Sequence, residues 1–529
     1  LSGEQVAGLT TAQISKLTDA QVVALSSAQV KVIETADLQQ LTNEQVQAIT
    51  TTGIKALSVD QVSKFTTAQI AALTSDQVRT LTADQIVSMT TAQVSKLTED
   101  QVKAMTTAQI KVIATDDFKV LSAAQLQAIT TDGVKALTVD QLGVITTAQI
   151  NKLSETQVSK LNVTQLQALT SDALRAMTET QVQAITTTGI KGLGLDQVSV
   201  LTTKQLAAMT TDQVVSLTAS QVDALTTDQI SKLTDSQVSS MTTSQIRNIA
   251  TDDIANLTAA QLQAITTDGV KALTGDQATA LTTAQISNLS VGQVGVMSAS
   301  QVQAIETRDL VKMTNDQIAA LTTTAVRGMS VDQLSQLTAA QLANLTTAQV
   351  SVLTGDQVAG LTTAQISKLT DVQVAAMSSS QVKVIETLDV QQLTAAQIQA
   401  ITTTAAKSLT VDQMAAFTTA QISKLTDAQV GVLSAAQVQS ITTADVVQMT
   451  NSQVQALSTT AVKGMLTSQV SSLTATQVAN LTAGQVPVLT ADQLVSLTTA
   501  QISKFTAEQM GVMTTAQIKS IATDDMQNL

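Results

Sequence analysis

Apolar side chains recur along the chain with a period of eight residues. Counted from Leu1, the 529 residues divide into 66 octads and a final Leu529, without insertion or deletion. Position 1 of the octad is Leu, Ile, Met or Phe throughout, position 6 is nearly always Val, Ile or Leu, and the consensus is Leu-Thr-x-x-Gln-Val-x-x. Such self-similarity predicts stacked units that bury a continuous core. We therefore expect one continuous solenoid over residues 1–529, with no internal domain boundary.

One long helix does not fit this period. Eight residues at about 100° each move the apolar positions about 80° further round with every octad, so no apolar face persists. The apolar runs also fall far short of the roughly 20 residues that a membrane-spanning helix needs. The pattern therefore excludes a coiled coil and a membrane span, and it indicates a short element in each octad.

The polar residues of the octad supply the start signal of a short helix. In the octad 97–104, Thr98 precedes Gln101 by three residues, which is the spacing of a capping box, and Leu97 and Val102 are spaced as a hydrophobic staple. Acidic residues gather at positions 3 and 4 and basic residues at positions 7 and 8, as the helix dipole favours. The sequence thus predicts an all-α solenoid of 66 short-helix repeats.

A β-solenoid is the alternative, because Thr and Val are abundant and both favour strands. Against it stand the lack of a two-residue alternation and the scarcity of turn formers, 19 Gly and one Pro for 66 corners. Pro487 opposes the helical interpretation, because a proline at position 7 removes a helical hydrogen bond.

The fifteen octads without Gln at position 5 follow a second, longer period. Seven have Asp there, and seven Gly/Ala octads lie two octads after a member of the Asp series, in which Ala173 stands in once. Successive members of the Asp series are alternately 80 and 56 residues apart. Both steps return to nearly the same side if a superhelical turn takes about 3.4 octads, or about 27 residues. We expect these octads to form stripes that mediate assembly, with local correction of packing or twist as the alternative. The candidate residues are Asp37, Asp117, Asp253, Asp309, Asp389, Asp445 and Asp525, and Gly53, Gly133, Gly189, Gly269, Ala325, Ala405 and Ala461.

Composition removes most catalytic and cofactor chemistry. The chain has no Cys and no His, which excludes thiol nucleophiles, imidazole bases and nearly all zinc, copper and haem sites. A net charge of −13 argues against a nucleic-acid partner. The Asp116-Asp117 pair lacks the ligand spacing of a calcium loop. We therefore expect no enzymatic activity, no cofactor, no metal site, no nucleic-acid partner and no insertion into a membrane.

Arrays such as LTTAQISKLTDAQV at 9–22 resemble the octapeptide-repeat regions of large bacterial surface and adhesin-like proteins. Together with the expected architecture, this resemblance implies a non-enzymatic rod that builds an extracellular or cell-surface filament or stalk by self-association. An adhesin-type binding solenoid or spacer with an unknown ligand is the alternative. The chain opens in mid-pattern without an initiator Met or signal peptide, so we interpret it as a segment of a longer protein or a processed product. Lack of cysteine suits an extracellular location.

Overall fold

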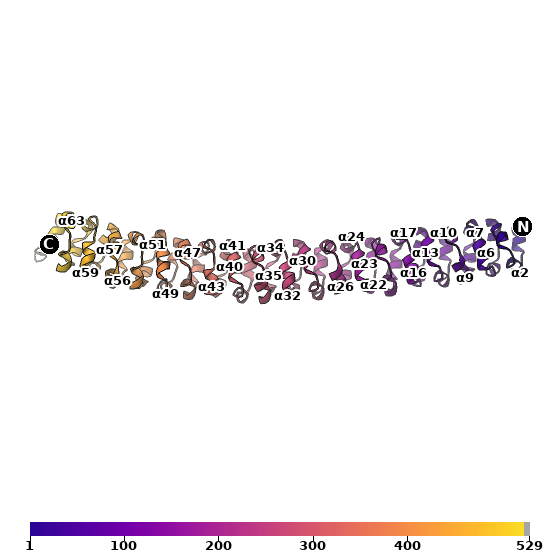
Figure 1. Cartoon of the computed structure of the whole chain (residues 1–529), viewed down its shortest axis with the longest axis horizontal. Coiled ribbons are helices and arrows are strands. Elements are labelled where there is room, and N and C mark those ends of the chain that lie inside the picture. Colours follow the sequence, from indigo (N-terminus) through magenta and orange to yellow (C-terminus); the bar gives the residue numbers. More distant parts are fainter. Residues whose placement is uncertain (523–529) are drawn as a thin grey trace. The chain divides into compact units, whose positions relative to one another are not determined.

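The computed structural model describes residues 1–522, which form short helices throughout (Figure 1). Sixty-four α-helices, α1 to α64, and one 3₁₀ helix, η1, follow one another, and no strand occurs in this part of the chain. The predicted all-α solenoid is confirmed, and the β-solenoid alternative is wrong for these residues.

Each α-helix begins at the third residue of its octad and contains four, five or six residues, as α13 (Glu99–Ala104) does with six. Helices α1–α60 belong to octads 1–60, octad 61 contains η1 (Val486–Val488), and α61–α64 belong to octads 62–65. The four-residue helices are α2 (Thr11–Ile14), α5 (Thr35–Leu38), α12 (Thr91–Val94), α19 (Thr147–Ile150), α20 (Glu155–Val158), α29 (Thr227–Ile230), α37 (Val291–Val294), α39 (Thr307–Leu310), α46 (Thr363–Ile366), α49 (Thr387–Val390), α53 (Thr419–Ile422) and α62 (Thr499–Ile502).

The helix starts are those that the octad predicts. The backbone N–H of Thr98 donates to Oε1 of Gln101 (2.8 Å), and the N–H of Gln101 donates to Oγ1 of Thr98 (3.3 Å). The staple residues Leu97 and Val102 are buried. Both interactions lie within one octad, so each unit defines its own helix start without reference to its neighbours.

The connections between helices need neither Gly nor Pro. At the end of α13, Met105 (φ −59°, ψ 141°) and Thr106 (φ −76°, ψ 161°) both have extended backbone, and Thr106 is already the N-cap of α14 (Thr107–Val112). No residue of the described chain has a positive φ. Two extended residues therefore make the corner after a six-residue helix such as α13, which explains why so few turn-forming residues suffice.

Helices stack on the third helix before and after them in the sequence. Thus α10 (Ser75–Thr80) contacts both α7 (Thr51–Ala56) and α13. Hydrogen bonds between successive turns join residues 25 to 31 positions apart, for example Gln47 to Ala72 and Gln101 to Ile70. This range includes the predicted value of about 27 residues per turn. The side chains of positions 1 and 6 fill the interior.

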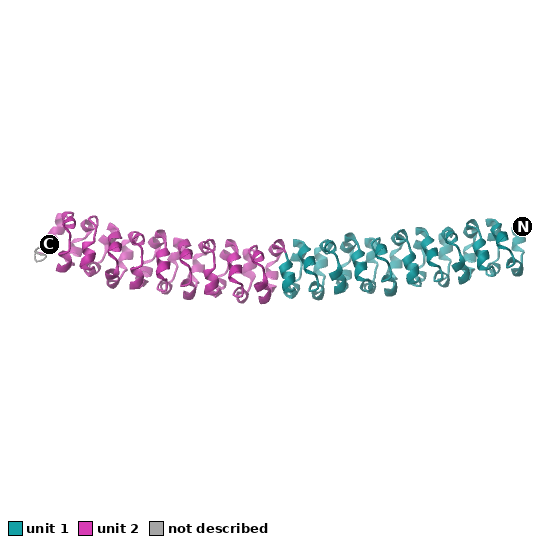
Figure 2. Cartoon of the chain, in the orientation of Figure 1, with its two compact units in different colours: residues 1–265 teal, residues 266–529 magenta. Residues whose placement is uncertain are grey.

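The chain divides into two compact units, residues 1–265 and 266–529 (Figure 2). Each unit is a stack of the same octads, and the octad frame runs through the division, because Ile265 is position 1 of its octad. A single continuous solenoid without a domain boundary stays a prediction.

Pro487 changes its own octad only locally. The octad 481–488 forms the 3₁₀ helix η1 in place of an α-helix. Its glutamine nevertheless keeps the usual bonds, since Nε2 of Gln485 donates to the carbonyls of Val454 (2.9 Å) and Leu457 (2.7 Å). The loss of one helical N–H is therefore absorbed within the octad.

Candidate functional site

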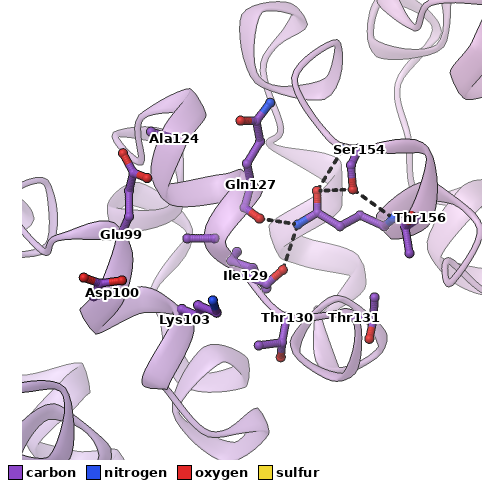
Figure 3. Close-up of a pocket in the computed structure, with 12 residues that line it drawn as sticks. Glu99, Asp100, Lys103, Ala124, Gln127, Ile129, Thr130, Thr131, Ser154 and Thr156 are labelled. Atoms are coloured by element: carbon purple, nitrogen blue, oxygen red, sulfur yellow. Dashed lines mark hydrogen bonds between the residues drawn. The ribbon is translucent and has the colours of Figure 1, made fainter.

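The glutamine at position 5 connects one turn of the solenoid to the turn before it. In α20, Oε1 of Gln157 accepts from the backbone N–H of Ser154 (2.9 Å). Its Nε2 donates to the carbonyls of Leu126 and Ile129 (both 2.8 Å), which lie at the end of α16 (Ala123–Ala128). Figure 3 shows the bonds that reach Ser154 and Ile129. One amide thus caps the start of its own helix and the end of an earlier one.

This arrangement satisfies polar groups that short helices leave unpaired. The last four carbonyls of a helix have no partner within the helix, and a buried carbonyl without a donor is costly. Gln157, only 3% of whose surface is exposed, supplies the donor for the carbonyl of Ile129 and a second donor for the carbonyl of Leu126, which also accepts from the backbone N–H of Ile129 (3.2 Å). Each junction ties together three octads, those of α16, α20 and the segment that begins at Ile129.

The first octads show that the burial of glutamine depends on a preceding turn. Gln5, Gln13 and Gln21 have no earlier turn within the chain and are exposed, whereas Gln45 is buried and bonds to Leu17 (2.6 Å). The sequence contained a signal of these bonds between turns. Glutamine has two donors and an acceptor, it lies next to the apolar position 6, and a buried side chain of this kind needs hydrogen-bond partners. The capping box, which the sequence predicts, gives a partner to the side-chain oxygen of the glutamine but none to its Nε2.

The Gly/Ala octads lie where an earlier turn packs closely. A Cβ on Gly53 would lie 2.9 Å from Cγ2 of Ile49 and 3.3 Å from Cγ2 of Val30, and one on Gly189 would lie 2.7 Å from Cδ1 of Leu166. Val30 belongs to α4 (Ser27–Lys31), three octads before Gly53. At Gly53 and Gly189 the position-5 side chain is therefore limited in size by a neighbouring turn. All seven candidates are buried: Gly53, Gly133, Gly189, Gly269, Ala325, Ala405 and Ala461.

The Asp octads also place their position-5 side chains inside. Asp37, Asp117, Asp253, Asp309, Asp389 and Asp445 are 3–6% exposed, and Asp525 lies outside the described residues. Asp309 accepts a hydrogen bond from the hydroxyl of Thr283, one turn earlier, and Oδ2 of Asp445 accepts from Thr442 (2.5 Å).

The helix starts of the Asp octads differ from the consensus. Five of the six described octads have Glu or Ala as N-cap and no side-chain cap hydrogen bond; these caps are Glu34, Ala114, Ala250, Glu306 and Glu386. The replacement of Gln by Asp thus accompanies the loss of the hydroxyl with which Gln forms the capping box.

The structure does not gather the special octads at one place. Helices contact their third neighbours, whereas successive members of each series are seven or ten octads apart. Because the position-5 side chains are buried, any contact that these octads make with a partner has to come from the exposed residues around them. The assembly stripes remain a prediction.

An open groove of about 440 Å³ lies over the first unit (Figure 3). Glu99, Asp100 and Lys103 of α13 form one part of it, and Ser154 and Thr156 form another. Two adjoining grooves share lining residues with it, so together they follow the furrow between successive turns. The furrow is a consequence of the stacking, and its charged residues are those of ordinary helix ends.

The described residues offer little chemistry beyond this. Within residues 1–522, no three acidic side chains lie close enough together to hold a metal ion. None of the helices in the same part of the chain is both long and apolar enough to span a membrane.

The model of the ALTTAQ repeat matches the chain in seven segments: residues 30–67, 63–91, 110–147, 198–235, 246–283, 302–339 and 382–419. The chain is a repeat protein. Together the matches cover just under half of its length. Five of the seven segments contain an Asp octad and the Gly/Ala octad two octads later. In the first segment these are the octads of Asp37 and Gly53.

No curated protein matches this repeat protein. Two solved structures, "Structure of APUM23-GGAAUUGACGG" and "Structure of APUM23-GGAGUUGACGG", are each 12% identical to it. The first alignment covers 98% of this chain and 97% of the other with a TM-score of 0.16, and the second covers 99% and 97% with a TM-score of 0.14. Similarities this weak indicate nothing about the structure or function of this chain.

Proposed function

We propose that the chain is a structural, non-enzymatic solenoid that builds an extracellular or cell-surface filament or stalk of a bacterium by self-association. The observation that carries the proposal is the glutamine junction, which ties each turn to the one before it through buried hydrogen bonds. A stack with such bonds between its turns should resist bending and pulling along its length, as a structural filament requires.

The composition supports the same role. The chain contains no Cys and no His, and its charged residues lie mainly at the ends of the helices. Lack of cysteine leaves no thiol to oxidise outside a cell. The resemblance of its octads to bacterial surface and adhesin-like repeats supports the proposed location.

Electron micrographs of the purified chain, recorded over a range of concentrations, test the proposal. We expect filaments or bundles with a regular axial repeat, and their abundance should rise with concentration. Single short particles at every concentration would contradict self-association.

The second candidate function is a binding solenoid or spacer, which the furrow lined by Glu99, Asp100 and Lys103 favours. In that case the chain stays single, and the furrow holds a ligand that carries both charges. Monodisperse particles in the same micrographs would favour this candidate.

A further inference from the structure

A set of exposed residues accompanies every Gly/Ala octad. Position 7 of all seven is a cation, although only a minority of the other octads have one there. Each of these cations is exposed: Lys55, Lys135, Lys191, Lys271, Arg327, Lys407 and Lys463. A helix dipole favours a cation at a helix end, but it does not explain why all seven of these octads have one.

The octad that follows adds an apolar residue and an acid. Val59 and Asp60 follow Lys55 by four and five residues, and both are exposed. The same pair recurs as Val139 and Asp140, Leu195 and Asp196, Val331 and Asp332, and Val411 and Asp412. Gly275 replaces the apolar residue once beside Asp276, and after Lys463 the exposed apolar residue is Leu466, with no acid.

The apolar member makes this pattern more than a helix-end effect. Val or Leu occupies position 3 in seven octads of the chain, and five of these follow a Gly/Ala octad. Those five side chains are 41–49% exposed, at a position where most octads have Thr, Ser, Ala or Asp. A helix cap does not require an apolar side chain there, and although Val331 lies against Gly360 of the next turn, its side chain stays 41% exposed.

Each group of a position-7 cation with the apolar residue and the acid that follow it is called here a cation–apolar–acid set. We infer that these sets form the surface through which a second copy of this chain binds. The inference rests on the proposed function and names the surface that carries it. A set is self-complementary, because a copy related by a two-fold axis places the cation of each chain beside the acid of the other and the apolar residues between them. The alternating intervals of seven and ten octads are reproduced by another copy of the same chain.

The cation-bearing helices of the first unit share one side of it. In Figure 1, α7, α17 (Thr131–Ala136) and α24 (Thr187–Gly192), whose ends carry the cations, lie along one edge of that unit. Competing bonds within the chain are weak. Lys135 pairs with Asp132 (3.1 Å), but both side chains are more than half exposed, and such pairs contribute little. Asp332 accepts one hydrogen bond, from Thr307 (3.0 Å), and keeps acceptor capacity.

Charge reversal within the first unit tests the inference. One variant combines Lys55→Glu, Lys135→Glu and Lys191→Glu, and the other combines Asp60→Lys, Asp140→Lys and Asp196→Lys. Each variant places like charges together at the contact, so we expect the dissociation constant for self-association, measured by sedimentation velocity, to rise at least about tenfold. An equimolar mixture restores opposite charges across the contact and should associate like the unaltered chain.

A matched control separates this contact from a general effect of charge. Lys31→Glu, Arg79→Glu and Lys111→Glu change the net charge equally at exposed position-7 sites outside the sets, and this variant should associate normally. Circular dichroism confirms that all variants are folded. If the unaltered chain associates and the charge-reversed variants associate equally well, this surface is wrong while the proposed function stands. If the unaltered chain never associates, the proposed function fails and the inference fails with it.

Discussion

At the scale of single residues, the glutamine amide explains why position 5 takes this residue so often. A primary amide offers one acceptor and two donors, and Gln157 uses all of them, toward Ser154 on one side and toward Leu126 and Ile129 on the other. Glutamate has the same length but no donor for the carbonyls of the earlier turn. The consensus residue is thus the one whose hydrogen-bonding groups match both helix ends.

Gln157→Ala should destabilise the junction by about 2–3 kcal/mol, because the buried carbonyl of Ile129 and the N–H of Ser154 lose their partner and the carbonyl of Leu126 loses one of its two donors. Hydrogen exchange at the amides of α16 and α20 should then be roughly 30- to 150-fold faster. Gln13→Ala is the matched control, since exposed Gln13 has the capping bond to Thr10 (2.9 Å) but no earlier turn. Equal effects of the two substitutions would show that the cross-turn bonds contribute nothing.

Gly189→Ala should destabilise the chain by about 1 kcal/mol, although alanine is the better helix former. The added methyl group would meet Cδ1 of Leu166 at 2.7 Å and Cγ2 of Ile185 at 2.8 Å. Gly3→Ala, where no atom lies within 4 Å, should be neutral or slightly stabilising. Chemical denaturation followed by circular dichroism compares the two variants. A stabilising Gly189→Ala would mean that the glycine is not required by close packing.

At the scale of the helices, each element is too short to be stable alone. A helix of four to six residues lies well below the roughly 12 residues at which isolated helices become marginal. Caps at both ends and contacts with the third helix before and after supply the stability that such short helices lack on their own. The element η1 shows how much irregularity this arrangement tolerates, since its junction stays intact.

Pro487→Ser should convert η1 into an α-helix like those on either side, because it restores the missing N–H. We expect exchange of the amides in octad 481–488 to slow, with a gain of about 1 kcal/mol. The reverse change, Ser471→Pro in α59 (Thr467–Ser472), should speed exchange there. Unchanged exchange in both octads would show that position 7 does not decide between the two helix types.

The helix starts were predictable from the sequence, and the bonds between turns were not. Thr98 and Gln101 lie in one octad, so their spacing is enough to predict their contact. The bonds from Gln101 to Ile70 and Leu73 depend on which earlier octad lies alongside, and this follows from the superhelical geometry. The buried placement of Asp37 and Gly53 depends on the same geometry, so the sequence revealed their period but not their surroundings.

At the scale of the whole molecule, the contacts between helices of residues 1–522 are short in sequence. The hydrogen bonds between turns span at most 31 residues, and helices contact their third neighbours. Stability in such a stack is close to a sum of local terms. A disturbance therefore decays within a few turns.

Gln157→Ala should consequently speed exchange only in octads near α16 and α20. Residues of the second unit, such as those of α52 (Val411–Ala416), should exchange at the unaltered rate. Exchange measured by mass spectrometry over the whole chain checks this. A uniform loss of protection in both units would contradict local stability and indicate one cooperative unit.

The constant offset of the glutamine bonds has a consequence for inheritance. Each amide needs carbonyls 28 and 31 positions earlier, and every octad provides them at its positions 1 and 6. Removing or adding eight residues anywhere leaves every later glutamine with equivalent partners. A gene with this repeat is therefore expected to tolerate the gain or loss of single octads by unequal recombination, because the product keeps the same glutamine junctions.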